Sequence, residues 1–327
     1  MFSRTVLSEY SNLLLTIYRH AQELPIQEFQ NTILSAIKLH LPFNSSMWGT
    51  ATMTDGGIDI HTVHLHNSSQ QMLLAYDKVK HLDLAAQQVS AVPTSTIAFD
   101  SVTDFPKDEQ LEYRKFLADF GHRHMLITSD INPITRFAQW VSLYRSDEGQ
   151  PCTDDECQLL AYLAPHLMQA LAINRLVHLD RLNSDVAREQ WSVAIADTRG
   201  VLYHADRRFK ELLDQEWAIK NNDRLPENLM QEMMGGQGQA IGAKIIVKCS
   251  AEQGLLFLKA RPKLAVDNLS AREFLVAKLM ASGLTQKQAA LKLERSPDTV
   301  RSQIKTVFDK LNINNITLLA PLLAMRD

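Results

Sequence analysis

The sequence predicts a multidomain α+β protein that ends in an all-α bundle, and three observations support this fold class. Strand-like hairpins and helical patterns share residues 1–153, leucines recur at helical spacing over 154–190, and three helix starts follow one another within 268–327. The 327 residues leave room for two or three domains. A content of 45% hydrophobic and 22% charged residues is typical of a globular protein.

Residues 1–153 are expected to form the first domain, with helices flanking a sheet built largely of hairpins. The turn Asp55-Gly56-Gly57 between two apolar runs is a strong hairpin signal. The segment from Pro93 to Pro106 is expected to be irregular. Strands are predicted at 47–53, 58–65, 124–131 and 137–144. Helices are predicted twice within 1–40 and then at 68–80, 82–90 and 108–119.

A long helix is predicted over residues 154–190, where leucines keep an approximately heptad spacing. Pro165 is expected to kink its start, because proline cannot donate to the helical ladder. Two interpretations stay open: the helix packs on its own domain, or it is a connector that also pairs with a second subunit. We favour the connector, because the pattern outlasts the roughly 10–14 residues of a globular helix. The spaced residues are Leu160, Leu163, Leu167, Leu171, Leu176, Leu179, Leu182 and Val186.

Residues 191–262 are expected to form a further small domain. Val193–Asp197 and Val201–Ala205 read as two strands joined by a turn at Gly200. A helix near 206–215 follows, then polar loops. Two more strands are predicted at 243–248 and 255–260.

Residues 268–327 carry three capped helix starts. Ser270 with Glu273, and Thr285 with Gln288, each fit the capping box, in which side chains bond the free amides of a first turn. The third start is Ser296-Pro297-Asp298, which combines an oxygen cap, a proline at the first helical position and an acid near the positive end of the helix dipole.

The third of these helices is predicted to have two distinct faces. An apolar stripe recurs at helical spacing, whereas Arg301, Ser302 and Lys305 share another face with Asp298. A short helix with an apolar back and a basic front, behind a tight turn from another helix, fits the major groove of DNA. The apolar stripe consists of Val300, Ile304, Val307, Phe308 and Leu311.

Charge supports DNA as the partner. Residues 268–327 contain nine Lys/Arg and five Asp/Glu, whereas the remaining residues contain 25 and 32. Because each neutralised phosphate releases counterions, a positive domain on an acidic body favours binding to nucleic acid. The excess is small, so two copies on paired half-sites are expected, and the protein is predicted to be a homodimer.

The same run resembles the C-terminal helix-turn-helix of LuxR/FixJ/NarL-type transcriptional regulators. The resemblance implies that Arg301, Ser302, Gln303 and Lys305 face DNA and that Lys287 and Thr299 lie near phosphates. Gln288, Gln303, Ile316 and Pro321 depart from the family pattern, and Pro321 puts dimerisation through the fourth helix in doubt. The motifs that carry the resemblance are Leu269-Ser270-Ala271-Arg272-Glu273, Ala281-Ser282-Gly283-Leu284-Thr285-Gln286-Lys287-Gln288-Ala289-Ala290, Ser296-Pro297-Asp298-Thr299-Val300-Arg301 and Val307-Phe308-Asp309-Lys310-Leu311-Asn312-Ile313.

The layout of the preceding regions also resembles known sensor modules. Residues 1–153 are similar in element order to a GAF-like domain and to the autoinducer-binding domain of LuxR proteins, and 191–262 resembles a reduced PAS-like module. Tyr76 and Asp83 partly echo the tryptophan–tyrosine–aspartate arrangement of acyl-homoserine-lactone receptors. A lactone-responsive quorum-sensing receptor is therefore an alternative function.

A small-molecule effector is expected to bind in the N-terminal domain, because apolar pockets with few polar groups are the usual ligand sites. The opposing interpretation is that its aromatic residues are ordinary core. The candidate pocket residues are Trp48, Tyr76, Phe99, Trp140 and Tyr144.

Several function classes find no support. The sequence has no Gly-rich phosphate loop, nucleophile elbow or metalloprotease helix motif, so we expect no enzymatic activity and no cofactor. The acidic cluster of a receiver domain is also missing. A metal site is conceivable only if His64 and His66 meet His122 and His124 on neighbouring strands, and we favour its absence.

We expect a cytoplasmic location without a membrane span. No stretch approaches the roughly 20 apolar residues that cross a bilayer. Three cysteines make a sparse, odd set that is typical of a reducing compartment. The sequence thus predicts a DNA-binding transcriptional regulator with RNA polymerase as a candidate second partner. A protein-interaction regulator that reads no bases is the competing class.

Overall fold

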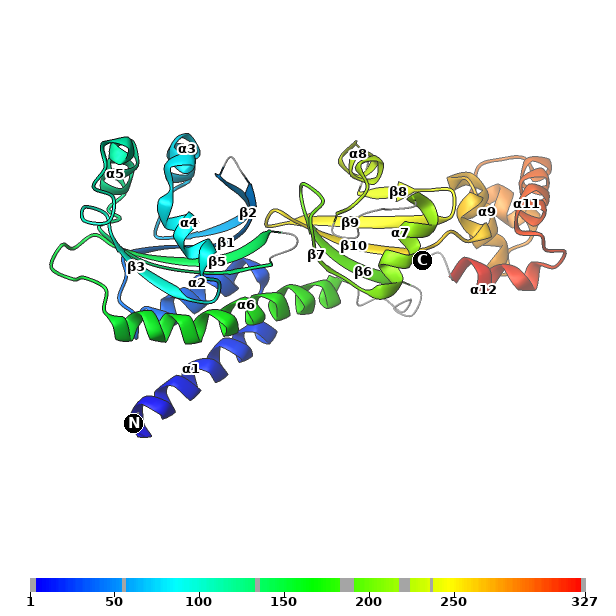
Figure 1. The fold of residues 1–327 in the computed structure, drawn as a ribbon. Coiled ribbons are helices and arrows are strands. Elements are labelled where there is room, and N and C mark those ends of the chain that lie inside the picture. The colour runs from blue at the N-terminus through cyan, green and yellow to red at the C-terminus, as the bar shows by residue number, and fades with distance from the viewer. Residues whose placement is uncertain are drawn as a thin grey trace. The chain divides into compact units, whose positions relative to one another are not determined.

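The computed structural model describes residues 4–54, 57–132, 136–182, 191–217, 224–235 and 238–324 (Figure 1). Two compact units divide the chain. The first comprises Met1–Asn183 with Ile195–Tyr203 and Ala251–Phe257. The second comprises Ser184–Ala194, His204–Ser250 and Leu258–Asp327.

The first unit, called the sensor below, is built on a five-stranded antiparallel sheet in the order β2-β1-β5-β4-β3. Both predicted hairpins are confirmed. The expectation of irregular chain between Pro93 and Pro106 is wrong over five residues, because an edge strand too short to show clear alternation pairs with β4 there. The strands are β1 (Ser45–Thr54), β2 (Gly57–His66), β3 (Thr96–Asp100), β4 (His124–Ile131) and β5 (Phe137–Arg145).

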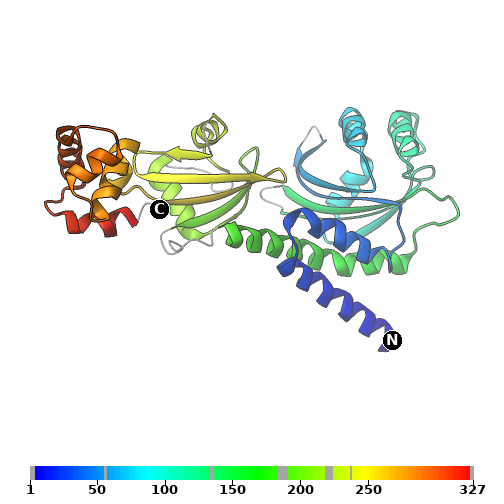
Figure 2. The same cartoon turned by 180° about the vertical axis from the view of Figure 1, so that it is seen from behind.

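Helices cover both faces of the sensor sheet. In Figure 1, α2 and α6 lie against one face and α3, α4 and α5 against the other. Figure 2 shows α1 and α2 beside α6, and these three helices contact one another. The sensor helices are α1 (Arg4–Glu23), α2 (Ile26–Ile37), α3 (Gln70–Val79), α4 (Leu84–Ala91), α5 (Leu111–Asp119) and α6 (Asp154–Leu182), with short 3₁₀ turns at Lys80–Leu82 and Asp108–Gln110.

The predicted long helix is present as α6, but its leucine stripe packs within the sensor. Leu160, Leu163, Leu167 and Leu171 are at most 2% exposed and join one hydrophobic core with α1 and α2. Their own unit therefore covers these four leucines, as the first of the two interpretations expects. Leu176 and Leu182 are exposed, and pairing of this helix with a second subunit stays a prediction. The predicted continuation over 183–190 lies outside the described residues.

A second antiparallel sheet has the order β7-β6-β10-β9-β8, the same order as the first when strands are counted along the chain. The predicted strands and the helix near 206–215 are confirmed. The expectation of loops between them missed α8 and β8, which are too short to show a clear periodic pattern. The elements are β6 (Ser192–Asp197), β7 (Leu202–Ala205), α7 (Arg207–Trp217), α8 (Glu227–Gly235), β8 (Gln239–Ile241), β9 (Ile245–Glu252) and β10 (Leu255–Pro262).

The C-terminal part of the second unit is an all-α bundle with its own hydrophobic core. Its helices are α9 (Ala271–Ala281), α10 (Gln286–Lys292), α11 (Pro297–Leu311) and α12 (Leu319–Ala324), with 3₁₀ turns at Ala265–Asn268 and Ile316–Leu318. Within the described residues, no helix is both long and apolar enough to cross a bilayer.

Candidate DNA interface and ligand cavity

The three predicted helix caps are confirmed and fix where the bundle helices begin. Ser270 with Glu273, and Thr285 with Gln288, form capping boxes at α9 and α10. The Ser296 hydroxyl accepts a hydrogen bond from a first-turn amide of α11 at 3.1 Å. Local sequence therefore determines the start of each of these helices.

Helix α11 buries the face that the sequence predicts. Val300, Ile304, Val307 and Leu311 are at most 6% exposed and belong to the bundle core. Phe308 is half-buried at the edge of this stripe. The stripe holds α11 against α9 and α10, so the opposite face of the helix points away from the core.

The exposed face of α11 carries the predicted basic residues together. Arg301, Ser302 and Lys305 are exposed and line a shallow groove with Asp298 and Phe308. In the described chain, neither the Arg301 guanidinium nor the Lys305 ammonium forms a hydrogen bond or an ion pair. Both cations are therefore available for a partner. The exposed face is defined here as Asp298, Arg301, Ser302 and Lys305.

Lys310, also on α11, forms an ion pair within the bundle and is therefore not available for a partner. The Lys310 Nζ donates to Glu273 Oε2 at 2.7 Å and thus links α11 to α9. This pair helps to fix the orientation of α11 relative to the bundle.

The other predicted DNA contacts lie around the exposed face. Lys287 is exposed in the first turn of α10, and Thr299 is exposed at the start of α11, where its hydroxyl contacts that of Ser296 at 2.8 Å. Gln303 is half-buried on the flank of α11, away from the exposed face. Pro321 lies in the first turn of α12, where a missing N–H leaves no helical bond unmade.

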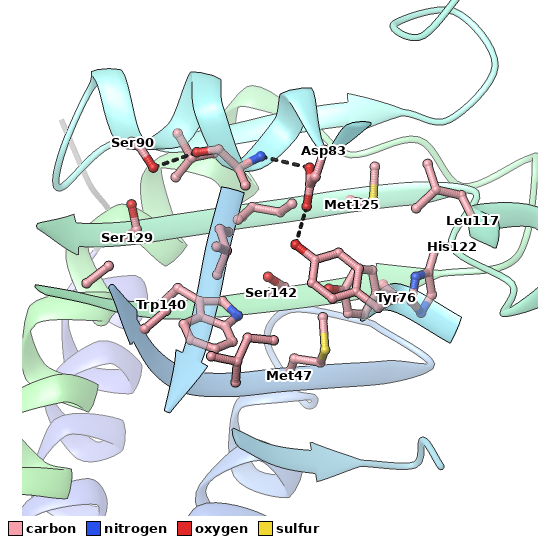
Figure 3. A pocket seen from close by; sticks show the side chains of 18 of the residues that line it. Met47, Tyr76, Asp83, Ser90, Leu117, His122, Met125, Ser129, Trp140 and Ser142 are labelled. Carbon is pink, nitrogen blue, oxygen red and sulfur yellow. Dashed lines mark hydrogen bonds between the residues drawn. The ribbon is translucent and has the colours of Figure 1, made fainter. Parts of the chain in front are cut away.

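A narrow cavity lies between the sensor sheet and α3, α4 and α5, with a free volume of about 60 Å³ (Figure 3). It is mostly apolar, with a few polar side chains. Of the predicted pocket residues, Tyr76, Trp140 and Tyr144 line it. The complete lining is Met47, Ala51, Met53, Ile58, Ile60, Tyr76, Asp83, Ala86, Val89, Ser90, Tyr113, Phe116, Leu117, His122, Met125, Ile127, Ser129, Ala138, Trp140, Ser142 and Tyr144.

Two of the predicted pocket residues do not line the cavity. Trp48 lies in the core on the other side of the sheet, 6.1 Å between ring centroids from Phe29, because adjacent strand residues point to opposite faces. Phe99 lies on the cavity side but stacks on Phe105 at 5.9 Å. The expectation that these two rings face a ligand is wrong.

A buried carboxylate joins the three helices over the cavity. Asp83 accepts hydrogen bonds from the Tyr76 and Tyr113 hydroxyls, each at 2.8 Å, and from the Ala86 amide at 2.9 Å, which makes it the N-cap of α4. Burial raises the pKa of Asp83 above its usual value of 3.8, although these hydrogen bonds act in the opposite direction. Burial and the carboxylate raise the pKa of both tyrosines, which stay protonated donors.

His122 lies beside this network, between the end of α5 and the start of β4. Its ring is 1% exposed and stacks on Tyr144, with 3.7 Å between centroids and 10° between planes. Desolvation lowers the pKa of His122 from 6.5 to about 4, so the imidazole is neutral at pH 7. Its Nε2 is buried and forms no hydrogen bond with the described residues.

Sequence reasoning missed Tyr113, Ser129 and the role of His122 in the cavity. Ser129 had a usable signal: it alternates along β4 with Met125 and Ile127, which share its face. Tyr113 had none, because its partner Asp83 is 30 residues distant in the chain.

The histidines that suggested a metal site belong to two separate places. His61, His64 and His66 lie on β2, whereas His124 begins β4 and His122 lies just before it. Strands β1 and β5 separate β2 from β4 in the sheet. Among the described residues, no three His, Cys, Asp or Glu side chains form a group suited to a metal ion.

The capped bundle, with one buried and one basic face on α11, defines a helix-turn-helix DNA-binding domain. Residues 267–323 match the sequence model of the bacterial regulatory proteins, luxR family. The C-terminal domain is thus of the LuxR type, and the protein is a DNA-binding transcriptional regulator. No curated protein sequence matches the chain.

Solved structures show more distant similarities. The lactone-dependent LuxR-family factor CepR2 from Burkholderia cenocepacia is 19% identical, with a TM-score of 0.39 over 54% of this chain and 99% of that one. Escherichia coli SdiA is 16% identical, with a TM-score of 0.37 over 98% and 97%. A GAF domain of a cyanobacterial phytochrome is 15% identical, with a TM-score of 0.37 over 52% and 97%.

Proposed function

We propose that the exposed face of α11 reads base pairs in the major groove and that a small molecule in the sensor cavity controls this binding. The proposal that α11 binds DNA rests on one observation, which is that this helix has a buried apolar side and an exposed basic side. The bundle core buries Val300, Ile304, Val307 and Leu311 on one side. Arg301 and Lys305, two unpaired cations, lie on the other side. A helix held by its back in this way presents its front to a partner.

Each residue of the exposed face has a distinct proposed role. Arg301 has a planar fork of donors that suits bidentate contact with a guanine edge. Ser302 can donate or accept and so suits several bases. Lys305, like Lys287 and Thr299 at the helix starts, suits phosphate oxygens, since these side chains are exposed and polar.

We expect a homodimer, because a single bundle would bind DNA only weakly. Nine cationic against five anionic residues in 268–327 give a modest positive field. Two bundles on half-sites about one helical turn apart would double the contacts and create specificity for a palindrome. RNA polymerase is a further proposed partner once the dimer is bound.

The cavity supports the effector part of the proposal. It is enclosed by apolar side chains and holds a few fixed polar groups, which is the usual composition of a ligand site. An effector changes DNA binding only if it binds two arrangements of the protein with different affinity. The helices over the cavity are candidates for the moving part, because Asp83 joins α4 to one tyrosine on α3 and another on α5.

The test is selection of preferred DNA sites from a random pool, followed by affinity measurements with the full chain. Arg301→Ala should weaken binding to the selected site by about 1–3 kcal/mol and relax the preference at one base pair. Arg207→Ala is the matched control, because it removes the same charge from an exposed side chain that pairs with Glu211 on its own helix.

The alternatives predict different results. An equal loss on selected and random DNA would make Arg301 a phosphate contact. Failure to enrich any site would favour a regulator that binds proteins through this bundle. Sedimentation of the full chain with selected DNA tests the dimer, and a strict monomer on the site would contradict it.

A further inference from the structure

Two polar atoms in the lining of the sensor cavity are buried and have no hydrogen-bond partner among the described residues. These atoms are His122 Nε2 and Ser129 Oγ, on side chains of residues that are 1% and 5% exposed. Native proteins seldom leave such groups unpaired, because each loses its bonds to water on burial. A molecule in the cavity would supply the missing partners.

The two atoms stand at opposite ends of the lining. Figure 3 shows Ser129 beside Trp140 at one end and His122 beside Tyr76 at the other. The strand register agrees, because Ser129 pairs with Trp140 and Met125 pairs with Tyr144, on which His122 stacks. Four residues of strand separate positions 125 and 129, or about 13 Å.

Between these ends the lining is largely apolar and adaptable, apart from Ser142 and the network of Asp83 with its two tyrosines. Met47, Met53 and Met125 line it, and methionine side chains change conformation easily. The free volume of about 60 Å³ is narrow, so an occupant would be slender or would displace these side chains.

The charge of the lining limits the occupant further. Among the described residues that line the cavity there is no lysine or arginine, and the one carboxylate there, Asp83, already accepts three hydrogen bonds. An anionic molecule would lie near that carboxylate without a compensating cation, and a cation would lose its hydration without an unpaired carboxylate to compensate its charge. Both charged forms are therefore disfavoured.

We propose that the effector is an uncharged, slender molecule with a hydrogen-bonding group at each end, and that His122 and Ser129 recognise those two ends. His122 is then the residue that determines specificity at the α5 end of the cavity. This inference rests on the proposed effector function and adds the chemical class of the ligand.

Three probes of equal chain length test this class by titration calorimetry on the full chain. Octane-1,8-diol offers a hydroxyl to both ends, octan-1-ol to one, and octanoate carries a charge. We expect the diol to bind about tenfold more tightly than the alcohol, since it satisfies one further buried group. Octanoate should bind more weakly than either.

Substitutions of His122 and Ser129 then test whether these two residues cause the tighter binding of the diol. His122→Phe keeps a ring for stacking on Tyr144 but removes Nε2, so it should reduce the affinity for the diol to that for octan-1-ol and leave the alcohol unchanged. Ser129→Ala is an independent second variant with the same expectation and a smaller structural change.

The outcomes separate this inference from the proposed function. Equal binding of diol and alcohol by the unsubstituted protein would overturn the two-ended ligand, and so would an equal loss of both probes in Ser129→Ala. Binding of none of the three probes would overturn the effector cavity itself and leave the DNA-binding assignment standing.

Discussion

The two faces of the sensor sheet differ in what they bury. On the face covered by α1, α2 and α6, the core is almost wholly apolar, with Phe29, Ile33 and Leu163 at 0% exposure. On the face covered by α3, α4 and α5, a carboxylate, two tyrosine hydroxyls and an imidazole surround a cavity. We therefore expect the first face to contribute most of the free energy of folding. The second face is packed less closely and carries polar groups that a ligand can contact.

Adjacent residues on β1 show how one strand serves both faces. Trp48 points into the apolar core, and Gly49 faces the other way, where a side chain would collide with the Trp140 ring. Substitutions on each face can test whether one face is mainly structural and the other binds a ligand.

The largest loss of stability is expected when a buried side chain on the apolar face is truncated. Phe29→Ala should lower the free energy of unfolding by about 4 kcal/mol, because it removes a fully buried ring and leaves a cavity beside Trp48. Urea unfolding measures the loss. Leu39→Ala is the matched control, since Leu39 is 83% exposed and should change stability by less than about 0.5 kcal/mol.

If the faces are independent, Phe29→Ala should still bind octane-1,8-diol with unchanged affinity while it remains folded. Loss of diol binding in the folded variant would show that the apolar face also shapes the cavity.

A smaller loss is expected from the buried carboxylate. Asp83→Ala should cost about 3 kcal/mol, because the Tyr76 and Tyr113 hydroxyls and an α4 amide lose their acceptor inside the protein. Asp77→Ala is the control, because Asp77 is an exposed carboxylate paired with Lys80 and should cost less than about 1 kcal/mol. Equal losses in the two variants would mean that the network over the cavity contributes no special stability.

Gly49→Ala tests the close contact between Gly49 on β1 and the Trp140 ring on the neighbouring strand β5. A Cβ at this position would lie 2.5 Å from the Trp140 ring and 2.4 Å from the Thr62 carbonyl oxygen. We expect a loss of about 2 kcal/mol and altered tryptophan fluorescence, as the ring is displaced toward the cavity. Gly149→Ala is the control, since its nearest atom would lie at an ordinary 3.4 Å. Unchanged fluorescence in Gly49→Ala would contradict the packing of Trp140 described here.

The smallest effect is a pH dependence that belongs to His122. The pKa of this group is about 4 in the folded protein and 6.5 when it is unperturbed, so the unfolded chain takes up a proton first as pH falls. The contribution of His122 is present above pH 6.5 and is lost as pH falls toward 4. Between about pH 7 and about pH 5.5, the unsubstituted protein should lose about 1 kcal/mol more than His122→Phe. Parallel losses would place the imidazole in contact with solvent.

A structural feature can be predicted from this sequence when the residues that determine it lie close together in the chain. The caps at Ser270, Thr285 and Ser296, and the buried stripe of α11, are set by residues within a few positions of one another. The sequence therefore predicts the DNA-binding bundle and the basic residues on its exposed face.

Signals that need the tertiary structure were misread or missed. Leucine periodicity in α6 is the same whether the partner is a second subunit or α1, so the sequence leaves both interpretations open and cannot decide for the packing on α1 and α2. The aromatic residue Trp48 was assigned to the cavity, because strand parity relative to an unknown face cannot be read from one strand. The link from Asp83 to Tyr113 depends on how α4 and α5 assemble over the sheet.

The most direct test of the account is hydrogen exchange of the full chain with and without saturating octane-1,8-diol. The division between the faces predicts slower exchange in α3, α4 and α5, where the helices joined through Asp83 cover the cavity, and unchanged exchange in α1, α2 and α6. Equal protection of both sets of helices, or protection confined to α1, α2 and α6, would contradict the assignment of the effector site to the polar face of the sensor sheet.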